Sequence, residues 1–185
     1  MANYTIEILK PTEIQDLLDL QSENLKINLD AQTIDSQGFV TFVYTPNVIE
    51  GMMNEPQIIA KSSDTIIGYA LTASLDYAHQ MTLMRPLAEM SKAIIYKNLP
   101  LSEYRYYIIG QVCVKAGFRG IGVFDALYEG HRHILSPRYD CCITEIDFEN
   151  KRSLAAHKRV GFEIIHTYFD EVSQKNWAVV LLDFH

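Results

Sequence analysis

A glycine-punctuated turn between an apolar strand and an amphipathic helix constrains the fold of this chain more than any other feature. The apolar run at residues 112–114 is followed by Gly117, Gly120 and Gly122, and helical periodicity begins at Val123. Such a turn exposes successive backbone N–H groups, and the first turn of the helix adds unpaired donors and the positive end of the helix dipole. Because glycine lets the backbone approach a ligand closely, the segment predicts a phosphate cradle.

Length and composition predict one globular domain. The chain has 185 residues, enough for one well-buried core but fewer than two ordinary domains need, so we expect a single domain over residues 1–185. Its 48% hydrophobic and 21% charged residues are typical of a soluble protein. The sequence contains no apolar run of membrane-spanning length and no secretory signal, so we expect no membrane partner and a cytoplasmic location.

Charge and cysteine usage exclude several classes of partner. The 23 acidic residues outnumber the 16 basic ones, which gives a net charge of −7. The largest basic clusters are the pairs 151–152 and 158–159, so we expect no nucleic-acid partner. The cysteines lie in segments that resemble buried strands, which predicts reduced core residues: Cys113, Cys141 and Cys142. Metal-ligand spacing is absent from the sequence, so we expect no metal.

Hydrophobic periodicity predicts the remaining elements. The expected strands are residues 4–8, 57–61, 65–73, 104–114, 141–148, 162–169 and 176–184. The expected helices begin near residues 12 and 45 and span 78–96, 123–135 and 150–160, while residues 28–38 are polar and irregular. This order predicts an α/β fold with a mixed sheet flanked by helices. An exposed edge near the last strand could pair in a homodimer.

A second motif follows the strand expected at residues 141–148. Asn150 is a good N-cap, and Gly161 is a good helix-ending residue. The pattern of Asn150, Ser153, His157 and Gly161-Phe162 resembles the second motif of the GCN5-related N-acetyltransferase (GNAT) superfamily, N-x-x-(S/A)-x-x-x-(Y/H)-x-x-x-G-F. The turn at residues 119–124 resembles the acetyl-CoA signature of the same family, R/Q-x-x-G-x-G/A, with phenylalanine where Gly or Ala is usual.

This resemblance covers residues 111–162 and implies a GNAT-like acyl-CoA N-acyltransferase fold with helices on both faces of the sheet. It also implies direct transfer of an acetyl group from acetyl-CoA, in a ternary complex, to a small-molecule amine or a peptide N-terminus. The turn would bind the pyrophosphate, and the preceding strand and second motif would bind the pantetheine and thiol end. The implied coenzyme-binding residues are Val112, Cys113, Val114, Phe118, Arg119, Gly120, Ile121, Gly122, Val123, Phe124, Asn150, Ser153 and His157.

Transfer to an amine requires a base that removes a proton. Gln111 lies where many relatives carry Glu, which removes the most familiar candidate. Glu145 and Asp147 share a face of the next strand by alternation, and Glu145 resembles the base position of acetyltransferases acting on ribosomal-protein N-termini. Glu145 is our first candidate and Asp147 our second. In the alternative, both carboxylates are solvated or paired with residues 151–152.

His157 stands where the family more often carries Tyr, so the resemblance implies that it either protonates the departing thiolate or lines the pocket. Gln111, Phe124 and His157 all depart from the commonest family pattern. Two alternative functions therefore remain open. One is a CoA-binding regulatory or sensor domain with little turnover, and the other is a transferase for a longer acyl chain.

Overall fold

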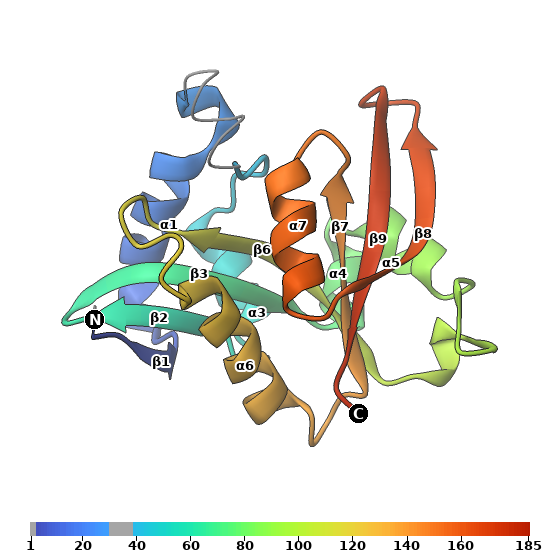
Figure 1. Cartoon of the computed structure of the whole chain (residues 1–185), viewed down its shortest axis with the longest axis horizontal. Helices are drawn as coiled ribbons and strands as arrows, with labels where there is room; N and C mark the ends of the chain where they lie inside the picture. The colour runs from blue at the N-terminus through green and yellow to red at the C-terminus, as the bar shows by residue number, and fades with distance from the viewer. Residues whose placement is uncertain (1–2, 30–38) are drawn as a thin grey trace. The chain divides into compact units, whose positions relative to one another are not determined.

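The computed structural model describes residues 3–29 and 39–185 (Figure 1). Most of the irregular segment expected at residues 28–38 lies outside the described residues. By spatial contacts the chain divides into two compact units. Unit 1 comprises Met1–Thr72 and Gly110–Leu135, and unit 2 comprises Ala73–Ile109 and Ser136–His185.

Unit 1 is built on an antiparallel hairpin. Strand β1 (Thr5–Ile8) pairs antiparallel with β2 (Ile58–Ser62), which pairs antiparallel with β3 (Thr65–Ala73). The second half of β6 (Tyr106–Val114) belongs to this unit, and the Lys115 N–H donates to the Ile67 carbonyl at 2.8 Å. The hairpin predicted between the second and third strands is confirmed.

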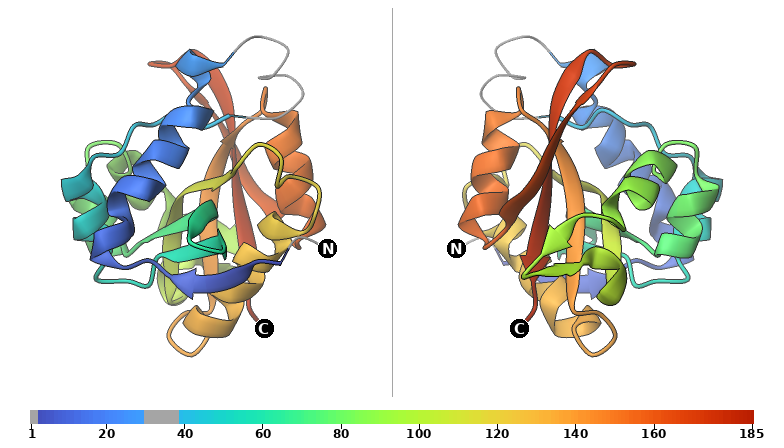
Figure 2. Two further views of the ribbon diagram at one scale, coloured as in Figure 1. Left: turned by 90° about the vertical axis from the view of Figure 1, so that its left-hand side faces the viewer. Right: turned by 90° about the vertical axis from the view of Figure 1, so that its right-hand side faces the viewer.

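Helices lie on both faces of the unit 1 strands (Figure 2). The chain forms α1 (Ile14–Asn24) after a short 3-10 turn, then a second 3-10 turn (Lys26–Asn28), α3 (Pro46–Met52) and α6 (Val123–Leu135). A Cβ added at Gly68 would lie 3.1 Å from Cγ1 of Val123, so this face of β3 packs closely on α6. Tyr69 points to the opposite face, toward Gln21 of α1.

Unit 2 contains the parallel strand pair and the C-terminal hairpin. The first half of β6 pairs parallel with β7 (Cys141–Asp147), which pairs antiparallel with β9 (Lys175–Asp183), and β9 pairs with β8 (Glu163–Asp170). The other elements are α4 (Leu75–Gln80), α5 (Arg85–Ser91), β4 (Ile95–Tyr96), β5 (Leu99–Pro100), a 3-10 turn (Leu101–Glu103) and α7 (Lys151–Arg159).

The hydrogen-bonded strand order is β1-β2-β3-β6-β7-β9-β8, so the predicted mixed sheet flanked by helices is confirmed. The last strand, β9, is interior, and the edge is β8. The edge expected near the last strand is therefore that of its hairpin partner β8, because the order of two strands within an antiparallel hairpin does not follow from their sequence. All three cysteines are buried free thiols, as predicted.

The single helix expected at residues 78–96 was also wrong. Two short helices occur instead: α4 starts at the Ser74 cap and ends where Met81 adopts extended backbone, and α5 starts anew with Pro86 in its first turn. Residues beyond α5 enter the two-stranded β4–β5 ribbon. In the described part of the chain, no helix has the length and apolar character needed to cross a membrane.

Candidate functional site

The glycine turn of unit 1 has the backbone geometry of an anion cradle. Gly117, Gly120 and Gly122 have φ values of 85°, 78° and 91°, which side-chain-bearing residues rarely adopt. A Cβ added at Gly117 or Gly120 would meet no described atom within 4 Å, so these positions face open space. Helix α6 begins directly after the turn, and the Ala126 N–H donates to the Gly122 carbonyl at 2.9 Å. The N-terminus of a helix directs its backbone N–H groups and the positive end of its dipole toward the turn that precedes it. This geometry fits a phosphate group.

The two basic side chains of the turn are fastened to the end of α1. The Lys115 ammonium lies 2.8 Å from a Glu23 carboxylate oxygen. The Arg119 guanidinium donates through Nε to the Val114 carbonyl at 2.9 Å and through Nη2 to Oδ1 of the buried Asn24. Sequence reasoning assigned Arg119 to coenzyme binding but missed Asn24, because no local pattern links residues so far apart along the chain.

Most of the apolar residues assigned to the coenzyme pack inside unit 1, whereas Ile121 in the turn is 45% exposed. Val112, Val114 and Phe118 lie against the core formed by β2, β3 and α6. The Phe124 ring packs edge-on against Tyr128, with ring centroids 5.0 Å apart. Cys113 is buried, and burial raises the pKa of its thiol to about 12, so it is neutral at pH 7. Because these side chains pack on the core, we expect the strand to contact a ligand through its main-chain groups.

In unit 2, Glu145 lies partly buried on β7 and accepts a hydrogen bond from β8. The Tyr168 hydroxyl donates to Oε2 of Glu145 at 2.6 Å. Burial raises the pKa of Glu145, the hydrogen bond from Tyr168 lowers it, and the negative charge of Asp170 raises it, with a net shift upward. Sequence analysis missed Tyr168, because it lies on β8, and no local pattern links that strand to β7.

Asp147 is more deeply buried than Glu145, at 4% exposure, and it is held in an ion pair. The Lys175 ammonium at the start of β9 contacts Oδ2 of Asp147, and the Glu149 N–H donates to Oδ1 at 2.9 Å. The basic partners considered at residues 151–152 are therefore not the ones observed. The ion pair fixes the Asp147 carboxylate against the start of β9.

The second motif forms the start and body of α7. Asn150 is the N-cap, as predicted, and its side-chain oxygen accepts from the Ser153 N–H at 3.1 Å. His157 is 1% exposed, with Nδ1 2.8 Å from the Ser153 carbonyl oxygen and its ring packed edge-on against Phe162. Burial lowers the pKa of His157 to about 4, so the imidazole is neutral at pH 7.

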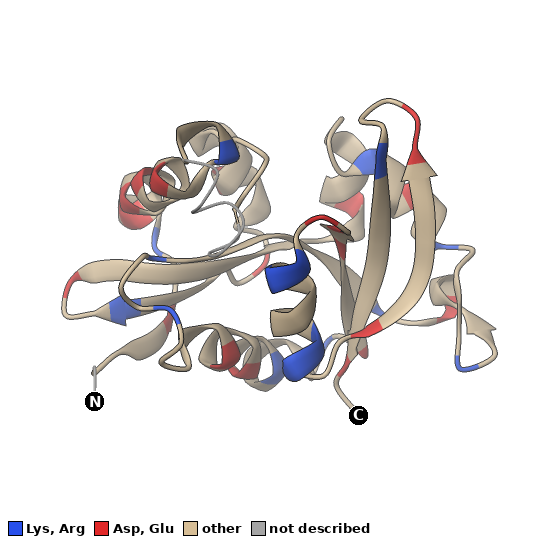
Figure 3. Cartoon of the chain, turned by 45° about the horizontal axis from the view of Figure 1, so that its top comes forward, with Lys and Arg blue, Asp and Glu red and all other residues tan. Residues whose placement is uncertain are grey.

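Basic residues occupy both ends of α7 although the chain is acidic overall (Figure 3). Lys151 and Arg152 lie in its first turn, and Lys158 and Arg159 lie in its last turn, all exposed to solvent. The cations of the last turn complement the negative end of the helix dipole. The described residues hold no cluster of three His, Cys, Asp or Glu side chains suited to a metal ion.

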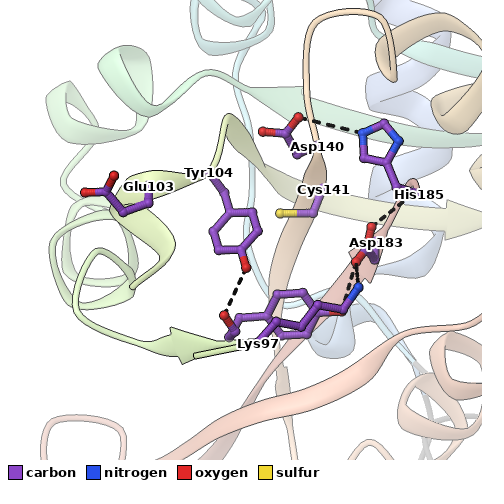
Figure 4. Close-up of a pocket in the computed structure, with 8 residues that line it drawn as sticks. Lys97, Glu103, Tyr104, Asp140, Cys141, Asp183 and His185 are labelled. Atoms are coloured by element: carbon purple, nitrogen blue, oxygen red, sulfur yellow. Dashed lines mark hydrogen bonds and ion pairs between the residues drawn. The ribbon is translucent and has the colours of Figure 1, made fainter. Parts of the chain in front are cut away.

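Unit 2 also contains a separate cavity of about 340 Å³ (Figure 4). Its lining residues are Tyr96, Lys97, Glu103, Tyr104, Asp140, Cys141, Asp183 and His185. The Asp183 carboxylate accepts from both Tyr96 and Lys97, at 3.1 and 2.6 Å. Asp140 pairs with Arg105 at 2.5 Å. Both carboxylates of this cavity therefore already have hydrogen-bond or ion-pair partners within the protein. For this reason we do not assign a ligand to it.

Comparisons with known proteins show which solved structures share this fold. No protein-family profile matches the sequence, and no curated protein matches it by sequence. Solved structures match over almost the whole chain. The ribosomal-protein-S18-alanine N-acetyltransferase from Escherichia coli shares 12% identity and covers 98% of this chain and 94% of its own, with a TM-score of 0.62.

Two further structures agree. An acetyltransferase of the GNAT family from Streptococcus pneumoniae shares 12% identity, covers 98% of this chain and 99% of its own, and has a TM-score of 0.62. Arabidopsis thaliana Naa50, solved with the bisubstrate analogue CoA-Ac-MVNAL, shares 16% identity, covers 97% and 98%, and has a TM-score of 0.63. The chain therefore has the fold of the GCN5-related N-acetyltransferases, as its two sequence motifs predicted.

Proposed function

We propose that this chain is an N-acetyltransferase that moves an acetyl group from acetyl-CoA to a primary amine by direct transfer. The observation that carries the proposal is the glycine turn ahead of α6, whose three positive φ angles suit an anion cradle in a chain with this fold. Acetyl-CoA would supply the acetyl group as an activated thioester. No metal is required for such a transfer.

The turn would hold the pyrophosphate through the backbone N–H groups of residues 120–124. The main chain of residues 112–114 would hold the pantetheine arm, because the Val112 and Val114 side chains pack on the core. Lys115 and Arg119 serve this site by fastening the turn to α1. Their contacts keep the cradle shaped before any ligand arrives, which reduces the ordering cost of binding.

Glu145 is the better candidate for the base. An amine arrives protonated and must lose a proton before it can attack a thioester. The raised pKa of Glu145 brings it closer to the working pH, and Tyr168 fixes one of its two oxygens, which orients the other. Asp147 is instead committed to Lys175. We therefore keep Glu145 as the proposed base and give Asp147 the role of organising the β7–β9 pair.

The geometry of His157 supports the pocket-lining alternative over the proton donor. Its Nδ1 lies at hydrogen-bonding distance from the Ser153 carbonyl, so Nδ1 carries the proton of the neutral imidazole. Nε2 of that tautomer carries no proton to donate, and the low pKa of His157 disfavours a second proton at neutral pH. Asn150 and Ser153 hold this helix start in place.

The acceptor is proposed to be a peptide N-terminus or a small amine. Peptide N-termini come first because one structural neighbour is named for acetylating an alanine of a ribosomal protein and another was solved with a CoA–peptide analogue. A cytoplasmic location, a homodimer and a single domain over residues 1–185 stay predictions of the sequence.

The test follows release of the CoA thiol from acetyl-CoA in the presence of peptides, polyamines, amino acids or aminoglycosides. The proposal predicts release that depends on one amine class, with Glu145→Gln reducing kcat at least a hundredfold while calorimetric CoA affinity is unchanged. Asp147→Asn should keep most of the activity in the folded fraction. Tight CoA binding without amine-dependent release would favour the sensor alternative, and absence of binding would contradict the proposal.

A further inference from the structure

Gln111 on β6 is a buried residue to which the proposed chemistry gives no role. It is 7% exposed, and both ends of its carboxamide are occupied. Oε1 accepts a hydrogen bond from the Tyr69 hydroxyl at 2.6 Å, and Nε2 donates to the Phe42 carbonyl oxygen at 2.9 Å. A carboxamide does not titrate, so Gln111 cannot act as a base, but it can accept from one neighbour and donate to another at once.

The same segment is tied at other points. The Tyr44 hydroxyl donates to the Gly110 carbonyl at 3.0 Å, and the Tyr44 N–H donates to Oε1 of Gln21 at 2.8 Å. The Val40 N–H donates to the carbonyl of Asn24 at 3.0 Å. We name residues 40–44 the wall segment. Its contacts run to the last turn of α1 at one end and to β6 at the other.

These ties place the wall segment relative to the strand that would carry the coenzyme. Under the proposed function, the pyrophosphate lies at the turn and the pantetheine runs back along residues 112–114. The acyl end of this path therefore falls near the residues that precede Val112. Gly110 and Gln111 are those residues, and they are the ones that hold Phe42 and Tyr44.

We propose that Gln111 is a positioning residue whose carboxamide holds the wall segment against β6 as one side of the acceptor site. The hydrogen bonds of Gln111 are present in the folded chain whatever its function. Only the claim that the wall segment borders the acceptor site rests on the proposed function. A polar side chain suits this buried position because both neighbours, a hydroxyl and a carbonyl, need partners.

This assignment predicts that installing the more familiar glutamate is harmful. Gln111→Glu removes the donor to the Phe42 carbonyl and places a carboxylate against that oxygen. The titratable neighbours are the Tyr69 phenol of β3, the Tyr44 phenol and the Cys113 thiol, and burial raises the pKa of Tyr69 and of Cys113. Arg119, Lys115 and Glu23 are the charges that act on Cys113. Burial will raise the pKa of the introduced carboxyl, and once protonated it can donate to Phe42 again.

The experiment is hydrogen exchange of peptides spanning residues 39–45 in the full chain, measured with and without CoA. In Gln111→Glu at pH 8, we expect exchange of the Tyr44 and Val40 amides to accelerate at least tenfold, after correction for intrinsic rates. At pH 5 the difference from wild type should shrink. Gln111→Met, which loses both hydrogen bonds without gaining a charge, should show the acceleration at both pH values. Gln80→Glu, exposed on α4, is the charge-matched control.

Wild-type exchange rates at residues 39–45 in both Gln111 variants would overturn the inference, and so would higher turnover in Gln111→Glu. If these variants do not fold, Tyr69→Phe removes only the hydroxyl that holds Oε1 of Gln111. It should accelerate exchange at the wall segment by a smaller factor, and an unchanged rate would overturn the inference as well. Calorimetry with CoA on the same samples separates the two ideas, because absent CoA binding contradicts the proposed function and leaves the exchange comparison intact.

Discussion

Tyr168→Phe is the substitution that tests the proposed base most sharply. The Tyr168 hydroxyl donates to Oε2 of Glu145 at 2.6 Å, so it stabilises the ionised carboxylate against the cost of burial. A hydrogen bond to a charged group is worth about 1.5–3 kcal/mol, or roughly one to two pKa units. We take the lower end because Glu145 is only partly buried. Removing the hydroxyl should therefore raise the already elevated pKa of Glu145 further.

The assay is the pH dependence of kcat/KM with the best amine. Because Glu145 must be ionised to accept a proton, the acid limb should move upward by about one unit, with about tenfold less turnover on that limb and an unchanged plateau at high pH. A carbon NMR titration of the Glu145 carboxyl should show the same shift. Tyr104→Phe is the matched control, since that hydroxyl donates to the Tyr96 carbonyl at 3.0 Å. An unmoved acid limb, or an equal loss at every pH, would refute the reasoning.

Three other predictions concern stability and binding. Burial lowers the pKa of His131 from 6.5 to about 4, so its contribution is complete above pH 6.5 and is lost as pH falls toward 4. In urea titrations, the wild type should lose roughly 3 kcal/mol of unfolding free energy over that pH window. The His131→Gln variant should not show this loss, because it has no titrating group at that position. Lys175→Met leaves the buried Asp147 without its cation and should cost about 1–3 kcal/mol by the same titration, whereas no loss would contradict the ion pair. Gly120→Ala, at a φ of 78°, should cost about 1–2 kcal/mol and weaken CoA binding in calorimetry, whereas Gly161→Ala, at a φ of 103°, should leave CoA affinity unchanged.

The fold was predictable wherever local sequence chemistry decides the structure. The turn before α6 needs glycine at its left-handed positions, and the capping side chain of Asn150 marks the start of α7. Helix continuity was not predictable between residues 78 and 96, because methionines at helical spacing continue the pattern across the break. Helix α4 starts at the Ser74 cap and ends at Met81, and the chain restarts a helix with Pro86 in the first turn of α5. Periodicity alone does not register these start signals.

The sequence predicted the carboxylates of the candidate site but not the residues that contact them. Alternation along β7 identified Glu145 and Asp147, but their partners, Tyr168 and Lys175, come from β8 and β9. Which residues meet across antiparallel strands depends on register, and the register of β8 shifts between Ile164 and His166. A strand sequence does not reveal such a bulge.

The most direct test of the account is to incubate the chain with isotopically labelled acetyl-CoA and a mixture of peptides, polyamines, amino acids and aminoglycosides, and to identify labelled amines by mass spectrometry. We expect label on one amine class in the wild type and almost none with Glu145→Gln. Label on no amine, in a chain shown to bind CoA, would contradict the claim that it is an N-acetyltransferase.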